Sequence, residues 1–152
     1  MSENGRVLIV PCSGIGKTYG TVGREAAYSL VEDLRPETTE IIALSLLVLG
    51  DEELRTQVQT APVIAVDGCK LACASKMVAE SGGRVGYEAN VLDTFRRNRT
   101  LRPKGISRLN ADGQELAHRL AEELAEATDK IMSVDLPESL VLSVAKDQLL
   151  GR

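Results

Sequence analysis

The sequence predicts a single three-layer α/β domain over residues 1–152, with a mostly parallel β-sheet covered by helices on both faces. Short, continuous apolar runs alternate with longer amphipathic stretches, and such runs are typical of strands that a parallel sheet buries on both faces. Right-handed crossovers between parallel strands then place helices on either side of the sheet. We find no internal repeat and no low-complexity tract. The expected arrangement is Rossmann-like.

The first predicted strand is the β-branched run RVLIV at residues 6–10. A glycine-rich loop follows, and then a helix whose apolar residues recur at helical spacing as far as Leu34. Pro36 ends this helix, because proline cannot continue it. A second strand is expected at about residues 40–44, followed by a short polar helix with Asp51 near its N-terminus.

A third buried strand is predicted at residues 62–66, PVIAV. The stretch at residues 69–81 is expected to be helical and to end at Gly82 and Gly83. A fourth strand is expected within residues 83–92, GRVGYEANVL. The part of the chain that carries motifs therefore covers about residues 6–80 and includes three of the four strands.

Residues 96–108 form an irregular basic run, which is either a solvated loop or an anion-binding patch. A long amphipathic helix is predicted over residues 111–132, and one more helix in the tail after it. The apolar row of the long helix either packs on the sheet or forms a contact in a homodimer. This row comprises Leu116, Leu120, Leu124, Ala127 and Ile131.

The composition argues against several classes of protein. Aromatic residues make up 3% of the chain, which is too few for a platform that stacks nucleic-acid bases. The net charge of −4 also disfavours nucleic acid as a partner. No apolar span is long enough for a membrane helix, and the N-terminus lacks the basic segment of a signal peptide. We therefore expect a cytoplasmic protein, in which the three cysteines are free, metal-bound or redox-active.

The three cysteines are expected to meet at one edge of the sheet. Cys12 lies two residues after the first predicted strand, and Cys69 lies three residues after the third. In a sheet of order 2-1-3 these strands are neighbours about 5 Å apart, and both loops open at the carboxyl edge, where doubly wound folds place their sites. Cys73 is four residues after Cys69, which puts both on the same face of the predicted helix.

Three thiols in one place favour a soft metal ion, of which zinc is the first candidate. Because Cys12 and Cys69 each precede or begin a predicted helix, their thiolates should be stabilised there. A fourth zinc ligand would come from Asp67, Ser13 or water, since the only histidine, His118, falls on the polar face of its helix. An open fourth position is typical of catalytic zinc, so an enzyme and a binding protein are both compatible with the pattern. The same cysteines could instead serve thiol redox or sulfur-handling chemistry.

The loop after the first strand also invites a nucleotide-binding interpretation. Gly16-Lys17-Thr18 matches the end of a phosphate-binding loop, and the strand ending in Asp67 resembles one that helps to hold magnesium. Proline at position 11 replaces the first glycine of that motif, however, and lacks the backbone N–H that the loop needs. A nucleotide-binding protein with a degenerate loop therefore stays an alternative.

Two motifs resemble the DGC-domain family. They are PCSGIGKTYGTVGREAAY, which contains Cys12-Ser13-Gly14, and APVIAVDGCKLACASKMV, which contains the Asp67-Gly68-Cys69 triplet. The resemblance spans roughly residues 6–77 and implies a small prokaryotic protein in which zinc binding is inferred from four cysteines. This sequence has three, and the fourth would fall near Ala43 or Ser45, after the second strand. The resemblance therefore implies an open metal site or a thiol site, and no particular substrate.

Overall fold

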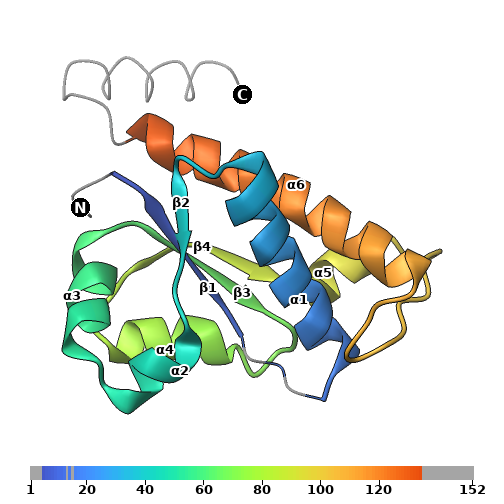
Figure 1. The fold of residues 1–152 in the computed structure, drawn as a ribbon, viewed down its shortest axis with the longest axis horizontal. Helices are drawn as coiled ribbons and strands as arrows, with labels where there is room; N and C mark the ends of the chain where they lie inside the picture. Colours follow the sequence, from blue (N-terminus) through green and yellow to red (C-terminus); the bar gives the residue numbers. More distant parts are fainter. Residues whose placement is uncertain (1–4, 13, 15, 135–152) are drawn as a thin grey trace.

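The computed structural model describes residues 5–12, 14 and 16–134 of the chain. Within them, four parallel strands form one sheet of order β2-β1-β3-β4 (Figure 1). This confirms the predicted α/β class and the predicted order of the first three strands. The strands are β1 (Val7–Pro11), β2 (Thr39–Ile41), β3 (Val63–Asp67) and β4 (Val85–Asn90).

Helices cover both faces of the sheet (Figure 1). One face carries α1 (Thr18–Ser29), its π-helical continuation η1 (Leu30–Leu34), α5 (Val91–Arg96) and α6 (Ala111–Val134). The other carries α2 (Leu44–Leu49), α3 (Glu52–Thr60) and α4 (Cys73–Glu80). The sheet is therefore the middle of three layers.

The central strands explain the continuous apolar runs in the sequence. Val7 and Ile9 of β1 face the core under α1 and α6, while Leu8 and Val10 face the core under α2, α3 and α4. All four are fully buried, because a strand inside a covered sheet has no face left for water. The apolar row of α6 packs into the first of these cores, so it is used within the protomer.

Two local predictions were wrong. The second strand ends at Ile41 instead of continuing to residue 44, since Leu44 and Leu47 are buried at the helical spacing of the short helix α2. Residues 69–72 form a turn, and the helix begins only at Cys73. As a result, Leu71 lies in the turn and is exposed.

The fourth strand and the long helix were predicted correctly, although α6 extends to Val134. The short helix α5 was not expected. It begins because the side chain of Asn90 accepts a hydrogen bond from the backbone of Leu92. The predicted helix in the tail lies outside the described residues. No helix in the described part of the chain combines the length and the hydrophobicity needed to cross a membrane.

Candidate functional site

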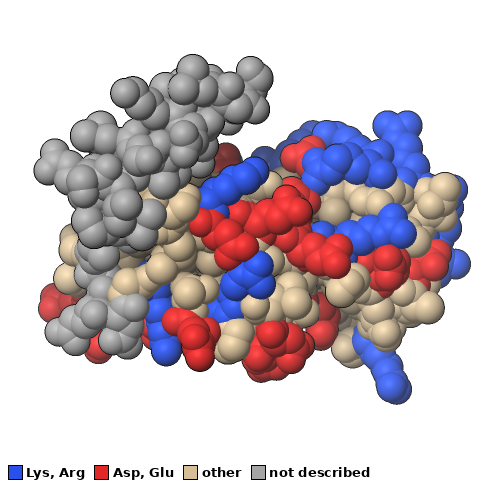
Figure 2. Space-filling view, turned by 90° about the horizontal axis from the view of Figure 1, so that it is seen from above, with Lys and Arg blue, Asp and Glu red and all other residues tan. Residues whose placement is uncertain are grey.

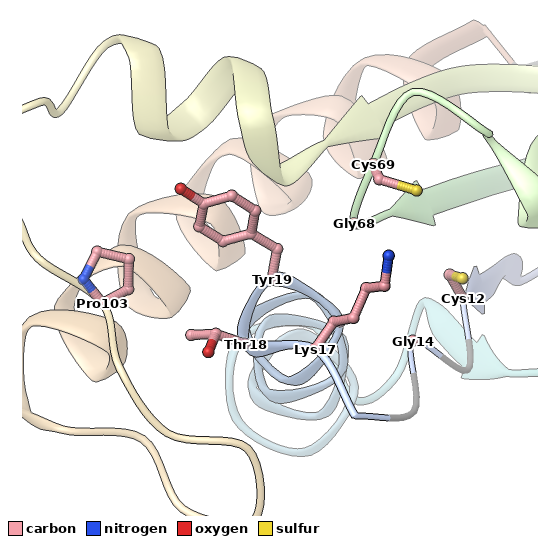
Figure 3. A pocket seen from close by; sticks show the side chains of 9 residues that line it. Cys12, Gly14, Lys17, Thr18, Tyr19, Gly68, Cys69 and Pro103 are labelled. Carbon is pink, nitrogen blue, oxygen red and sulfur yellow. The ribbon is translucent and has the colours of Figure 1, made fainter.

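A cavity of about 390 Å³ opens at the carboxyl edge of the sheet, where β1 and β3 end (Figure 3). Two of the three predicted cysteines, Cys12 and Cys69, line it from neighbouring strand ends. The topology therefore brings them together as the sequence predicted, and we call this space the thiol cavity. Its lining comprises Cys12, Gly14, Lys17, Thr18, Tyr19, Gly20, Gly68, Cys69 and Pro103.

Cys12 is held by an extension of the hydrogen-bond ladder of the sheet. Its backbone N–H donates to the carbonyl of Val66 in β3, with an N···O distance of 2.8 Å. This bond fixes the start of the loop against the adjacent strand. The thiol is partly buried and faces the cavity from one wall (Figure 3).

The surroundings of Cys12 favour the protonated thiol. Burial raises its pKa, and this effect exceeds the opposing one of a backbone hydrogen bond from Gly14. The negative charges of Asp67, Cys73 and Cys69 raise the pKa further. The expectation that a helix N-terminus stabilises the Cys12 thiolate was therefore wrong, because α1 begins only at Thr18 and the burial of Cys12 dominates.

Asp67 anchors the second loop. Its carboxylate is almost completely buried and accepts hydrogen bonds from the backbone N–H of Ala74 at 2.8 Å and of Ser75 at 3.2 Å. The Ser75 hydroxyl donates a third bond, at 2.9 Å. Asp67 therefore caps the N-terminus of α4, where a negative charge is stabilised by unpaired N–H groups and by the helix dipole.

The turn between Asp67 and α4 positions Cys69. Its carbonyl accepts hydrogen bonds from the side-chain amide of Asn90, at 3.0 Å, and from the backbone of Ala72, at 3.2 Å. Ala72 adopts a left-handed conformation with a φ of 53°, which turns the chain into α4. Three consecutive strands in the order β1-β3-β4 thus contribute to the placement of the two cysteines.

Glycines allow the two loops and α1 to approach one another closely. A Cβ atom on Gly20 would lie 2.3 Å from the carbonyl oxygen of Gly14, and one on Gly68 would lie 3.0 Å from the backbone nitrogen of Gly20. Neither contact leaves room for a side chain. These glycines therefore serve the close packing of three backbone segments around the thiol cavity.

Lys17 and Thr18 mark the beginning of α1 on the cavity wall. Among the described residues, no side chain caps the N-terminus of this helix. In Figure 3 the Lys17 side chain extends from the helix start toward the space between Cys12 and Cys69. A cation is thus available to an anionic ligand or to a thiolate. The carboxylate of Asp67, in contrast, is already engaged by α4, which leaves it poorly placed to hold magnesium as the nucleotide-binding interpretation requires.

The remaining candidate ligands are dispersed. Cys73 is exposed at the first position of α4 and does not line the thiol cavity, although its charge acts on Cys12. Ser13 lies outside the described residues. His118 is exposed and pairs with Glu122, as its place on the polar face predicted. Among residues 5–12, 14 and 16–134, no three or more His, Cys, Asp or Glu side chains are grouped so as to hold a metal ion.

The sequence interpretation missed the outer wall of the cavity. Tyr19 and Pro103 complete that wall, and Pro103 belongs to the irregular segment before α6 (Figure 3). This segment is tied to α1 by the hydroxyl of Thr21, which donates to the carbonyl of Ile106 at 2.5 Å. Nothing in the sequence alone indicated that a segment some ninety residues after Cys12 returns to its site.

Comparison with known families agrees with these motifs. The model of the DGC domain matches residues 8–131, which is most of the chain and reaches from β1 into α6. The chain belongs to the DGC-domain family. The match extends well beyond the two cysteine motifs and includes the segment that closes the outer wall of the cavity. Neither the search of curated proteins nor that of solved structures gave a match.

Proposed function

We propose that this DGC-domain protein binds a soft metal ion, zinc in the first instance, through the thiolates of Cys12 and Cys69. The observation that carries the proposal is their convergence on one cavity from two separate strand ends. Thiolates are the ligands that select zinc and similar soft cations. A positive ion would also offset the repulsion that Asp67 and neighbouring thiolates exert on a Cys12 thiolate.

The donor set supports an open site. Cys12 and Cys69 supply two thiols from the cavity wall, and Cys73, which acts electrostatically on Cys12, is the candidate for a third. Asp67 is a weak candidate because α4 already uses both of its oxygens. A metal held in this way keeps a position for water or for a ligand in the cavity.

The test is the metal content of protein purified without oxygen and without a histidine tag. We expect about one zinc per chain, with thiols that react with a colorimetric reagent only after chelation. Cys12→Ser and Cys69→Ser should each abolish retention of the metal through gel filtration. Protein that folds, holds no zinc and shows three freely reactive thiols would refute the proposal.

A gain-of-function variant offers a sharper test. Ala43 is exposed at the N-terminus of α2, directly after β2 and hence beside the carboxyl end of β1. It is one of the two positions at which the family resemblance implies a fourth cysteine. Ala43→Cys should raise zinc affinity by at least about tenfold, since it adds a thiolate to an incomplete set. Ala79→Cys, exposed on α4, is the control and should leave the affinity unchanged.

The second candidate function is thiol redox or sulfur-handling chemistry by Cys12 and Cys69. It is favoured by a specific observation: two free thiols share an open cavity that leaves room for a small molecule, and the described residues present no preformed group of three metal ligands. Such chemistry needs one thiol to attack and the other to resolve the mixed intermediate.

The raised pKa of Cys12 bears on this candidate, because a protonated thiol is a poor attacking group. Because burial raises that pKa above 9.0, Cys12 should be protonated at pH 7 and react slowly with iodoacetamide in the metal-free protein. The rate should rise with pH as the thiolate fraction grows, and the midpoint of this rise should lie above that of an ordinary thiol. Mass spectrometry of peptides separates the three cysteines. Fast modification of Cys12 at neutral pH would show that its charge environment is not the one described above.

A further inference from the structure

We infer that this protein takes a phosphorylated small molecule, whose phosphate lies in a hollow lined by three arginines beside the thiol cavity. The inference rests on the proposed function in one respect only: the other end of that molecule is expected to reach the thiols. The hollow has a volume of about 540 Å³ and is lined by Tyr19, Leu92, Phe95, Arg96, Arg99 and Arg102. We call it the arginine hollow.

The hollow adjoins the thiol cavity, because Tyr19 lines both. The Tyr19 ring packs against Phe95, with 5.7 Å between the ring centroids and a tilt of 38°. Figure 3 shows Tyr19 and Pro103 on the side of the cavity away from Cys12. A ligand that crosses Tyr19 would therefore place one end near the arginines and the other near Cys69 and Cys12.

The charge of the hollow is not a property of the whole surface. The chain carries a net charge of −4, yet all three charged residues of the lining are arginines. Figure 2 shows lysine and arginine side chains gathered at the right-hand end of the molecule, where Figure 1 places α5 and the segment that follows it. A local excess of arginine on an acidic protein favours a specific anion over general binding to polyanions.

The three arginines differ in the ion pairs and hydrogen bonds that their guanidinium groups form. Arg96 pairs with Asp93 at 3.1 Å on the exposed surface. The Arg102 guanidinium donates to the backbone carbonyls of Arg99 and Leu101, and its own backbone N–H donates to Asp112. In the part of the chain that the structure describes, neither Arg99 nor Arg102 forms a side-chain ion pair with a carboxylate. Two guanidinium charges are thus left for a ligand.

The segment that carries these arginines has a defined shape. The side chain of Asn110 accepts a hydrogen bond from the backbone of Lys104 at 3.0 Å and donates to the carbonyl of Arg102 at 2.9 Å. The bond from Thr21 to Ile106 then attaches the segment to α1. A binding group held by such bonds loses little conformational freedom when its ligand arrives.

The chemistry of the lining selects a phosphate ester. Guanidinium groups bind phosphate oxygens through pairs of charge-assisted hydrogen bonds. The remaining lining residues, Tyr19, Leu92 and Phe95, suit an organic part that is flat or apolar. Inorganic phosphates carry the same anionic group without an organic part. A comparison of the two kinds of ligand therefore shows whether the organic part contributes to binding.

The test compares ADP with inorganic pyrophosphate by isothermal titration calorimetry on the full chain. ADP should bind more tightly, because only ADP carries an organic group for Tyr19 and Phe95. Arg96→Gln combined with Arg99→Gln should weaken binding at least about tenfold, since two charged donors are lost. The single variant Arg99→Gln, whose side chain makes no bond described above, covers the case in which the double variant misfolds. Arg84→Gln, exposed before β4 at the opposite edge of the sheet, should change nothing.

Equal affinity for both probes would still support the anion site, with inorganic phosphate as its ligand. The inference is overturned if neither probe binds below about 1 mM, or if Arg84→Gln weakens binding as much as Arg99→Gln. After removal of the metal, bound ADP should also slow the reaction of Cys69 with iodoacetamide in the wild type and not in the double variant. Absence of that protection would overturn the placement of the ligand across Tyr19.

Measurement of zinc content shows whether the anion site or the proposed metal site has failed. The arginine variants should keep the metal of the wild type, because no arginine belongs to the thiol cavity. Wild-type protein without zinc that still binds ADP through Arg99 would refute the metal site alone. Wild-type protein with zinc and without affinity for either probe would refute the arginine hollow alone.

Discussion

Two loops supply the cysteines of the thiol cavity, and they are built in opposite ways. The loop from β3 to α4 is organised around Asp67, which is buried and accepts three hydrogen bonds from the helix that follows. In the loop from β1 to α1, the described residues 12, 14, 16 and 17 supply no such anchor, and none of their side chains caps the helix that follows. The second loop, from β3 to α4, is therefore fixed by internal contacts, whereas the first, from β1 to α1, leaves backbone N–H groups and the Lys17 side chain beside the cavity.

The difference suggests a division of roles. A buried carboxylate whose oxygens are all engaged fixes the position of Cys69 and has little capacity left for a ligand. An uncapped helix start with a nearby lysine has that capacity, since it favours negative charge. In this molecule Asp67 of the Asp-Gly-Cys triplet acts as a structural support for Cys69, and the first loop is where a ligand is expected to make further contacts.

The largest expected effect follows from removing the anchor of the second loop. Asp67→Ala should lower the free energy of unfolding by about 2–4 kcal/mol, because it leaves buried donors of α4 without an acceptor. Chemical denaturation measures this loss. Asp51→Ala is the matched control, since Asp51 caps α3 from an exposed position, and it should cost only about 1 kcal/mol. Equal losses would mean that Asp67 is an ordinary cap.

The packing of the first loop against α1 can be tested with a pair of glycines from the same helix. Gly20→Ala should cost about 1–3 kcal/mol, because its Cβ would meet backbone atoms of Gly14 that cannot move aside easily. At Gly23, a Cβ would make ordinary contacts of 3.5 Å with Val66 and Val91. Gly23→Ala should therefore be tolerated, or stabilise the helix by up to about 1 kcal/mol. A similar loss for both variants would contradict the close approach at Gly20.

The sequence predicts those parts of the site that follow from strand order, and it does not predict those set by individual side-chain contacts. The convergence of Cys12 and Cys69 was predictable, because it needs only buried strands and their order in the sheet. The placement of Cys73 was not, since a spacing of four residues suggests a shared helix face unless the intervening turn is known. That turn exists because Asp67 caps α4 by accepting a hydrogen bond from Ala74, seven residues later. Sequence motifs for helix caps cover only two or three residues, so they do not reveal this cap.

The outer wall was unpredictable for a related reason. Tyr19 and Pro103 meet the thiol cavity only because the segment before α6 folds back on α1, which single hydrogen bonds such as that of Thr21 determine. The sequence did present residues 96–108 as a basic run, with a solvated loop and an anion patch as its two interpretations. Three arginines of this run line a hollow together with Tyr19, and this hollow is where an anion would bind.

Substitutions of Asn90, at the end of β4, should have a smaller effect on stability and separate its two hydrogen bonds. Its amide donates to the carbonyl of Cys69, and its side-chain oxygen accepts from Leu92 at the start of α5. Asn90→Asp keeps the cap and loses the donor, so it should cost about 1 kcal/mol. Asn90→Ala loses both and should cost about 2 kcal/mol. If Asn90→Asp is as stable as the wild type, the bond to Cys69 does not help to fix this loop.

The smallest effect concerns the uncapped start of α1 and runs in the opposite direction. Lys17 occupies the N-cap position with the extended conformation that serine or aspartate adopts there. Lys17→Ser should therefore stabilise the protein by about 0.5–1 kcal/mol, while Lys70→Ser, exposed in the other loop, should leave stability unchanged. The same substitution removes the cation beside the thiols, so affinity for the anionic ADP should fall. Greater stability with weaker binding would show that the first loop gives up a cap in order to keep its N–H groups and its lysine available to a ligand.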